Sequence, residues 1–148
     1  MEFTIKRFEE LTPAELYEII KERIDIFIVE QNCIYHECDG KDYKAWHLLA
    51  REGSRLIGYL RILPPGISYV EASIGRVLVA KDFRRRGVGR SIMNLAIEYI
   101  SMKLGEKRIR ISAQARLEEF YAGLGFRKVS SVYLEDGIPH IEMLYERV

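Results

Sequence analysis

The chain begins with a segment of two-residue hydrophobic periodicity followed by one of helical periodicity. Residues 4–8 alternate and predict a short strand. Thr12, Pro13 and Glu15 then supply an N-cap, a proline at the first helical position and the glutamate of a capping box. The helix that follows should bury one face until about residue 30, because its apolar residues recur at three- and four-residue steps: Leu16, Ile19, Ile20, Ile24, Phe27 and Ile28.

The middle of the chain predicts three strands and a second helix. Apolar, partly β-branched runs at 45–51 and 55–63 flank Glu52-Gly53-Ser54 and predict a hairpin, and residues 73–80 predict a further strand. A helix is predicted from 89 to 104, ended by Gly105. Its apolar face should consist of Ile92, Leu95, Ala96, Tyr99 and Ile100.

The last third predicts a strand at 108–113, a short helix at 116–124, and strands at 126–134 and 138–145 joined by the turn Glu135-Asp136-Gly137. The resulting order is β-α-β-β-β-α-β-α-β-β. This order predicts an α/β (α+β) fold with a mixed, mostly antiparallel central sheet and helices on both faces. Because no repeat, low-complexity tract or linker interrupts the pattern, we expect one domain over residues 1–148.

Composition and charge narrow the functional classes. The 148 residues are 48% hydrophobic and 30% charged, as in globular proteins, and the net charge of +1 argues against a nucleic-acid partner. No apolar run approaches the roughly 20 residues of a membrane-spanning helix, and the amino terminus lacks a signal-peptide pattern, so we expect a cytoplasmic protein without a membrane partner. The spacing of Cys33 and Cys38 matches no common zinc site, and we expect reduced thiols and no metal.

A basic, glycine-containing segment joins the third predicted strand of the middle region to the helix that follows. It reads Arg84-Arg85-Arg86-Gly87-Val88-Gly89-Arg90-Ser91. The first amides of a helix lack intrahelical partners and carry the positive end of the macrodipole, so they can hold a pyrophosphate. The two glycines allow close approach, and Arg84, Arg86 and Arg90 would add charge-assisted hydrogen bonds. The segment lacks the Gly-Lys-Ser/Thr of a Walker loop and the third glycine of a dinucleotide fingerprint.

A second motif follows at residues 114–126, which read Gln-Ala-Arg-Leu-Glu-Glu-Phe-Tyr-Ala-Gly-Leu-Gly-Phe. Together, Arg84-x-x-Gly87-x-Gly89 and this segment resemble the motifs of the GNAT superfamily of acyl-CoA N-acyltransferases. Gln114 and Leu117 stand where that family more often has Asn and Ala. Three further stretches resemble the ElaA-like subgroup: Val29-Glu30-Gln31-x-Cys33-x-Tyr35-x-Glu37-x-Asp39-Gly40, Ile74-Gly75-Arg76-Val77 and Glu135-Asp136-Gly137-Ile138-Pro139-His140.

The resemblance implies a sheet splayed between its fourth and fifth main strands, with acetyl-CoA in the cleft and direct acetyl transfer to an amine in a ternary complex. It places the backbone N–H near Val79 on the thioester carbonyl, the peptide groups of Leu78 and Val79 along the pantetheine, and Gln114 and Tyr121 beside the cofactor. Tyr121 would also protonate the leaving thiolate, since a phenol pKa near 10 is close to the roughly 8.5 of a thiol.

The reaction also needs a proton acceptor, because amines are mostly protonated at neutral pH. The sequence leaves the base open among five residues expected around the cleft: Glu37, Asp39, Glu71, Glu135 and His140. Glu30, Glu37 and Asp39 could instead recognise a cationic acceptor, whereas His47, within a strand, is interpreted as structural. We expect the acceptor to be the primary amine of a small molecule, peptide or protein, and a homodimer is left open. The alternative is a non-catalytic acyl-CoA-binding regulatory module, which would need no proton donor at Tyr121.

Overall fold

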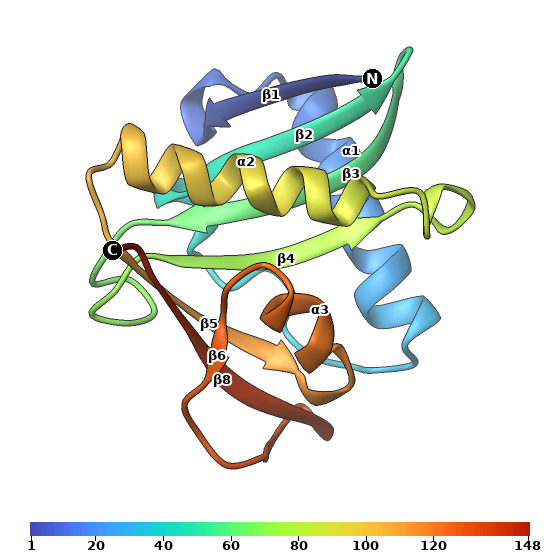
Figure 1. Ribbon diagram of the computed structural model, residues 1–148. Helices are drawn as coiled ribbons and strands as arrows, with labels where there is room; N and C mark the ends of the chain where they lie inside the picture. Colours follow the sequence, from blue (N-terminus) through green and yellow to red (C-terminus); the bar gives the residue numbers. More distant parts are fainter.

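The computed structural model describes residues 1–148 and contains two four-stranded antiparallel sheets (Figure 1). The first sheet has its strands in sequence order: β1 (Glu2–Arg7), β2 (Trp46–Glu52), β3 (Arg55–Leu63) and β4 (Ser73–Val79). The second has β8 (Ile138–Glu146) at its centre, paired with β5 (Arg108–Gln114), β6 (Arg127–Lys128) and β7 (Tyr133–Glu135).

The two sheets are connected at one end only. A single parallel bridge joins Ala72 and Ile109, and the Arg110 amide donates to the Ala72 carbonyl at 2.9 Å. Beyond this point β4 and β5 separate, which confirms the expected splay between these strands (Figure 1). The splay leaves one edge of β4 without a neighbouring strand.

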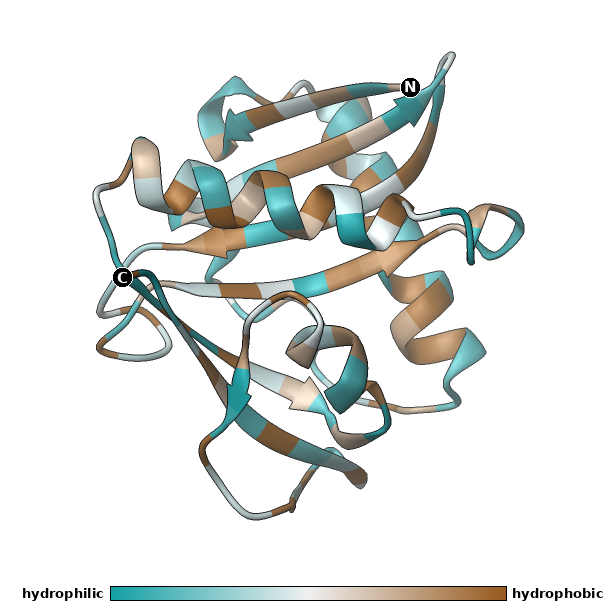
Figure 2. Cartoon of the chain, in the orientation of Figure 1, coloured by the Kyte–Doolittle hydropathy of each residue, from teal (hydrophilic) through white to brown (hydrophobic).

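Two helices cover the first sheet, and one short helix packs on the second. α1 (Pro13–Arg23) and α2 (Val88–Met102) lie on opposite faces of the first sheet, while α3 (Glu118–Ala122) lies against β5 and β6 (Figure 1). The main core has 22 buried residues, and a smaller cluster of six lies on the α1 side. Because both of its faces are covered, β3 is buried at every position after Arg55, and its apolar run is nearly continuous (Figure 2).

The predicted capping box at the start of α1 is confirmed, but the predicted apolar stripe is only partly right. The Thr12 hydroxyl accepts from the Glu15 amide at 3.1 Å, and the Glu15 carboxylate accepts from the Thr12 amide at 2.8 Å. The α-helix ends at Arg23, and residues Ile24–Glu30 continue as a π-helix. The wider π turns bury Ile26, whereas Ile24 is 38% exposed.

Two further predictions need correction. In α2 the buried stripe includes Met93 and Ile97, while Leu95 is 36% exposed, since periodicity alone does not decide which flank of the stripe meets neighbouring elements. The strand predicted at 126–134 is divided into β6 and β7. The Val129 amide bonds to β8 at 2.9 Å, the Ser130 hydroxyl accepts from the Glu142 amide at 2.8 Å, and the following residues leave the ladder.

The turn between β7 and β8 follows the prediction. Asp136 and Gly137 have φ values of 50° and 78°, the left-handed geometry of a two-residue hairpin turn. No helix in the structure combines the length and the hydrophobicity needed to cross a lipid bilayer.

Candidate active site

A cleft of about 750 Å³ lies between the two sheets where they splay apart. β4 and the start of α2 line one side, and β5, α3 and the β7–β8 turn line the other. The π-helix and the loop after it also line the cleft. Residues far apart in the sequence therefore face one cavity.

The open edge of β4 forms one wall of the cleft. Val77, Leu78 and Val79 line the cavity, and no strand pairs with this edge beyond Ala72. A bulge interrupts the β3–β4 pairing between the pairs Arg61–Gly75 and Tyr59–Leu78, and at the bulge Arg76 has a φ of 53°. Free N–H and C=O groups on such an edge can pair with an extended ligand.

The amino terminus of α2 opens into the same cleft, as predicted for an anion site. Gly87 is the N-cap residue of α2 and has the left-handed conformation. The Ser91 amide donates a hydrogen bond to the Gly87 carbonyl at 3.0 Å, which closes the first turn of the helix. The preceding amides of the first turn have no partner within the helix. A Cβ at Gly89 would lie 3.4 Å from the Phe120 ring, so side-chain atoms there would enter the narrow space between α2 and α3.

The arginines of this segment serve different contacts from those expected. Arg84 pairs with Glu30 at 2.7 and 2.9 Å, and its Nε donates to the Val79 carbonyl at 3.0 Å. The hydrogen bond from Arg84 lowers the pKa of Glu30. Arg86 stacks on Phe83 at 5.1 Å, and an added Cβ at Gly123 would lie 3.4 Å from Arg90.

The predicted cofactor residues divide into two sets. Leu78, Val79, Arg84, Arg85, Gly87, Val88, Gly89, Gln114 and Tyr121 line the cleft. Arg86, Arg90 and Ser91 do not. Arg84 is paired with Glu30, and Arg86 and Arg90 lie outside the cavity, so the backbone amides and Arg85 are the groups of this segment that face the cleft without an acidic partner.

Tyr121 and Gln114 lie on the wall opposite β4. Tyr121 is 7% exposed and packs edge-on against Phe120 and Phe126. Burial raises the pKa of Tyr121 to about 12, so the phenol keeps its proton throughout the neutral range. The Gln114 amide donates to Gln31 at 3.2 Å and accepts from Arg116 at 3.1 Å, which fixes its orientation.

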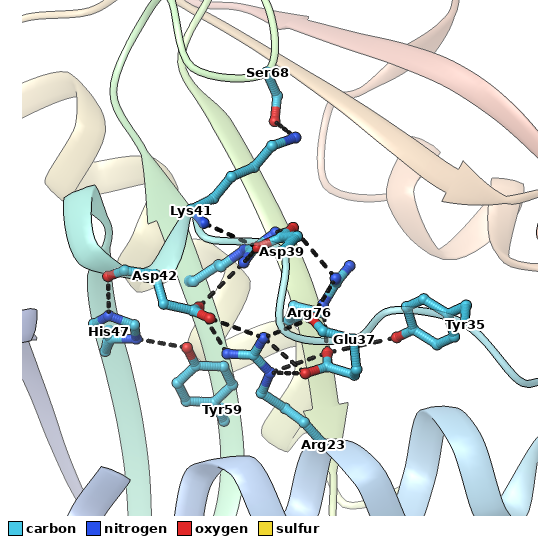
Figure 3. Close-up of polar contacts among 11 residues, drawn as sticks. Arg23, Tyr35, Glu37, Asp39, Lys41, Asp42, His47, Tyr59, Ser68 and Arg76 are labelled. Carbon is cyan, nitrogen blue, oxygen red and sulfur yellow. Dashed lines mark hydrogen bonds and ion pairs between the residues drawn. The ribbon is translucent and has the colours of Figure 1, made fainter.

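A buried ionic network lies behind the other end of the cleft (Figure 3). Arg23 pairs with Glu37 at 2.8 Å and with Asp42 at 2.7 Å. Arg61 pairs with Asp39 at 2.5 Å and with Asp42 at 3.1 Å. Arg76, at the β4 bulge, completes the network by pairing with Glu37 and Asp39.

The charges of this network balance, with three guanidinium groups and three carboxylates. Burial by itself would raise the pKa of Asp39, but hydrogen bonds from Arg61 and its charge outweigh this and hold the pKa well below its usual range. Burial also opposes the charge on Arg23, yet its hydrogen bond to Asp42 and further nearby groups raise its pKa. Arg23, Arg61, Asp39 and Asp42 therefore stay charged near neutral pH.

The ionic network contains two of the five candidate bases. Glu37 is 4% exposed and is held by two arginines, and Asp39 is held by Arg61 and Arg76. Glu71 does not line the cleft but pairs with Arg110 at 3.0 Å, which lowers its pKa. The structure thus does not bring Glu37 or Glu71 to the cavity, and it leaves Asp39 there without free lone-pair capacity for catalysis.

Glu135 and His140 line the cleft together. Nδ1 of His140 lies 2.7 Å from the Ile138 carbonyl, which can only accept, so Nδ1 carries the proton in the neutral ring. Nε2 then keeps its lone pair, 3.5 Å from the Glu135 carboxylate. Glu135 also accepts from the Ser112 hydroxyl at 3.0 Å. The histidine is thus oriented as a proton acceptor beside an anion.

The two remaining histidines are His47, interpreted from the sequence as structural, and His36. Both ring nitrogens of His47 are bonded, one to the Tyr59 hydroxyl at 2.6 Å and the other to the Asp42 carbonyl at 3.0 Å. Burial lowers the pKa of His47, and the ring supports the loop of the ionic network. His36 is exposed in the loop beside the cleft.

The cysteines are both free thiols. Cys33 is buried, and its Sγ donates to the Asp136 carbonyl at 3.3 Å, a contact that links the loop after the π-helix with the β7–β8 turn. No three His, Cys, Asp or Glu side chains come together as they would to hold a metal ion.

Sequence reasoning missed Arg23, Asp42 and Arg61. Two of them carried a signal: Arg23 follows Ile19 by four residues and so falls on the apolar stripe of its helix, and Arg61 interrupts the apolar run of β3. A charged residue at a position predicted to be buried indicates an ionic partner. Asp42 carried no such signal, because it lies in a polar loop.

Comparisons with known proteins agree with this geometry. The model of the acetyltransferase (GNAT) domain family matches residues 11–147. Protein ElaA of Escherichia coli is 38% identical over 139 residues, which cover 93% of this chain and 91% of ElaA. The crystal structure of E. coli ElaA has a TM-score of 0.92 at 36% identity, covering 98% of this chain and 99% of that one.

Two further solved structures share the architecture. An acyl-CoA N-acyltransferase from Pseudomonas aeruginosa has a TM-score of 0.92 at 37% identity, covering 98% of this chain and 99% of that one. An aminoglycoside 6′-N-acetyltransferase complexed with coenzyme A has a TM-score of 0.72 at 15% identity, covering 97% and 96% of the two chains, which shows the common fold alone.

Proposed function

The chain belongs to the GNAT acetyltransferase family, and from this premise we propose that it transfers an acetyl group from acetyl-CoA to a primary amine by direct attack in a ternary complex. One observation carries the proposal. A single cleft contains the free edge of β4, the amino terminus of α2 and a buried tyrosine, Tyr121. An extended thioester with a pyrophosphate at one end matches that arrangement.

The residues of the cleft fit acetyl-CoA. The free edge of β4 at Val77, Leu78 and Val79 would pair with the amide groups of the pantetheine arm, as an added strand does. The amides at the start of α2 would bind the pyrophosphate, and Gly89 leaves the narrow space between α2 and α3 free of a further side chain. The aminoglycoside acetyltransferase complexed with coenzyme A has the same fold, which supports this assignment.

Two side chains supply the proton transfers. Tyr121 would donate its proton to the departing thiolate, and its raised pKa, about 12, keeps the phenol protonated until that step. Nε2 of His140 would accept a proton from the attacking amine, directly or through water. The Glu135 carboxylate would stabilise the resulting imidazolium. A backbone N–H at the β4 edge near Val79 would polarise the thioester carbonyl.

A paired acid and base distinguish an enzyme from a binding module. A regulatory acyl-CoA-binding protein would need the β4 edge and the α2 terminus but neither the hydroxyl of Tyr121 nor an oriented His140. Tyr121 of α3 and His140 of β8 both line the cleft that contains the proposed cofactor groups. This placement favours catalysis.

Thermal unfolding with and without ligands tests the cofactor, and thiol release tests the reaction. Acetyl-CoA and free coenzyme A should stabilise the fold, by about 2.7 kcal/mol at 100 times the dissociation constant, and NAD should not. Thiol release from acetyl-CoA should then require an amine, and parallel assays with butyryl- and octanoyl-CoA measure the preference for acetyl. Stabilisation by NAD but not by acetyl-CoA would reject acetyl-CoA as the cofactor. Binding of acetyl-CoA without thiol release in the presence of any amine would support the regulatory module.

A further inference from the structure

The end of the cleft away from α2 has two walls of different chemistry. One wall carries Lys41, close to Arg61 and Arg76 of β3 and β4. The other carries Ser112, Glu135 and His140 of β5 and the β7–β8 hairpin. An acceptor bound at this end, under the function proposed above, would lie between them.

Lys41 is a cation of the first wall that no carboxylate neutralises. The three arginines of the ionic network are neutralised by Glu37, Asp39 and Asp42. Lys41 is not part of that balance, because its ammonium donates to the Ser68 hydroxyl at 2.8 Å and has no carboxylate within 4.0 Å. Figure 3 shows its side chain directed away from the three carboxylates toward Ser68. Lys41 is half-buried and lines the cleft, so it is available to an anionic ligand.

The second wall carries the opposite charge. The Glu135 carboxylate accepts from Ser112 and lies 3.5 Å from His140, and no lysine or arginine pairs with it. Its side chain is 49% exposed and lines the cleft. The Glu135 carboxylate would therefore attract an ammonium group to a position beside His140, the proposed base.

The segment before β4 connects these two walls. Ser68 accepts from Lys41, and the next residue, Tyr69, lies beside Ser112 and Tyr133. Burial raises the pKa of Tyr69 to about 12, and the nearby Tyr133 adds to the shift. The cation of one wall and the carboxylate of the other thus belong to one continuous pocket, separated by uncharged hydroxyl groups.

We propose that the acceptor is a free amino acid, bound with its amine at Glu135 and His140 and its carboxylate at Lys41. This inference rests on the proposed function and names its substrate class. A diamine would place a second ammonium against Lys41, and two like charges 4 Å apart near a protein surface repel strongly. An amide or simple amine would leave the Lys41 ammonium without an anionic partner.

Calorimetry in the presence of free coenzyme A measures this recognition without any turnover. The twenty common amino acids, β-alanine and 4-aminobutyrate are screened, and the tightest binder is compared with its own carboxamide and its decarboxylated amine. We expect the acid to bind about 10- to 100-fold more tightly than either, the range of one charged hydrogen bond. The same ratio should appear in kcat/KM for thiol release.

Variants at the lysine separate carboxylate recognition from general effects. Lys41→Met should reduce the preference for the acid to near one by raising KM, while Lys41→Arg should keep it. Lys44 is exposed and lies outside the cleft, so the Lys44→Met variant should bind the amino acid like the wild type. Equal affinity for acid, carboxamide and amine, or no binding by any amino acid, would overturn the inference. Neither result bears on the proposed function, which fails if acetyl-CoA does not stabilise the protein or if no amine of any class releases thiol from it.

Discussion

The two ends of the cleft are built in different ways. The end at α2 is made by one contiguous segment, residues 84–91, and its working groups are mostly backbone amides. The ionic network behind the opposite end is made by charged side chains from α1, β3, β4 and the loop between α1 and β2, and Arg23, Glu37 and Arg61 among them are buried. Backbone groups suit a cofactor common to a whole family, whereas under the proposed function the side chains at the opposite end would define the pocket for an individual acceptor.

The two ends also respond differently to change. A backbone anion site tolerates the loss of single side chains, since the donors remain in place. A buried ionic network does not, because removal of one partner leaves an uncompensated charge in a medium where charges are costly. Substitutions at the two ends should therefore differ in kind, one affecting affinity and the other stability.

The largest effect is expected from Arg23→Met. The substitution leaves Glu37 and Asp42 facing each other without their shared partner, and Arg23 is only 1% exposed. Breaking a buried pair in this way typically costs about 3–5 kcal/mol, a large part of the stability of a domain. Urea unfolding monitored by circular dichroism measures the loss.

An exposed ion pair is the matched control for Arg23→Met. Arg55 pairs with Asp82 at 2.7 Å, but both side chains are more than half exposed. Arg55→Met should leave the urea midpoint unchanged within error. If Arg23→Met were equally silent, the network would contribute no stability and the contrast between the two ends would be lost.

The next largest effect is expected from Gly89→Asp, and it concerns affinity. The new side chain would start in the first turn of α2, 3.4 Å from the Phe120 ring, and its charge would repel a pyrophosphate at the amino terminus of the helix. Because two like charges 4 Å apart near a surface repel by about 4 kcal/mol, acetyl-CoA should bind at least about 100-fold more weakly. Calorimetry on the folded variant measures the change.

Asn94→Asp supplies the same charge on the same helix but farther from its amino terminus. Asn94 is exposed and does not line the cleft, so its replacement should change acetyl-CoA affinity little. A comparable loss in both variants would mean that net charge, rather than the helix terminus, governs binding.

A smaller effect on binding but a clear effect on rate is expected from Tyr121→Phe. The ring and its packing against Phe120 and Phe126 remain, so acetyl-CoA affinity should be nearly intact. The rate of transfer should fall about 100-fold, a usual contribution of a general acid. Steady-state kinetics on the amine found by screening gives both quantities. Equal turnover would assign Tyr121 to packing.

The smallest effect is a pH dependence of stability to which His47 and the ionic network contribute. Burial lowers the pKa of His47 in the folded state, so its contribution is complete above pH 6.5 and is lost as the pH falls toward the folded value. The pKa values of Asp39 and Asp42 are also lowered, so their contribution is complete above pH 3.8 and is lost below it.

Unfolding free energies measured by urea titration should therefore decline in two stages on acidification, with a slope of at most about 1.4 kcal/mol per pH unit from each group. His47→Gln should remove the stage that begins near pH 6.5 and keep the stage below pH 3.8. A profile with the same first stage in the variant would assign that stage to another group.

Much of the fold was predictable because its signals are local. The capping box at Thr12, the hairpin between residues 45 and 63, and the Asp136-Gly137 turn depend on neighbouring residues, and the structure confirms them. The predictions that failed depended on distant contacts. The π-helix after Arg23 and the division of residues 126–134 into β6 and β7 follow from packing and from hydrogen bonds to β8.

The sequence by itself determined the element order, the family and the glycine segment at the start of α2, because each is written in consecutive residues with fixed spacing. Only the tertiary structure showed which candidate bases are paired with arginines and which line the cleft without one. It paired Glu37, Asp39 and Glu71 with arginines up to 39 residues away, and it left His140 and Glu135 in the cleft without an arginine or lysine partner. Which charges neutralise one another depends on distances between side chains, and those distances are set when the two sheets and α1 pack together.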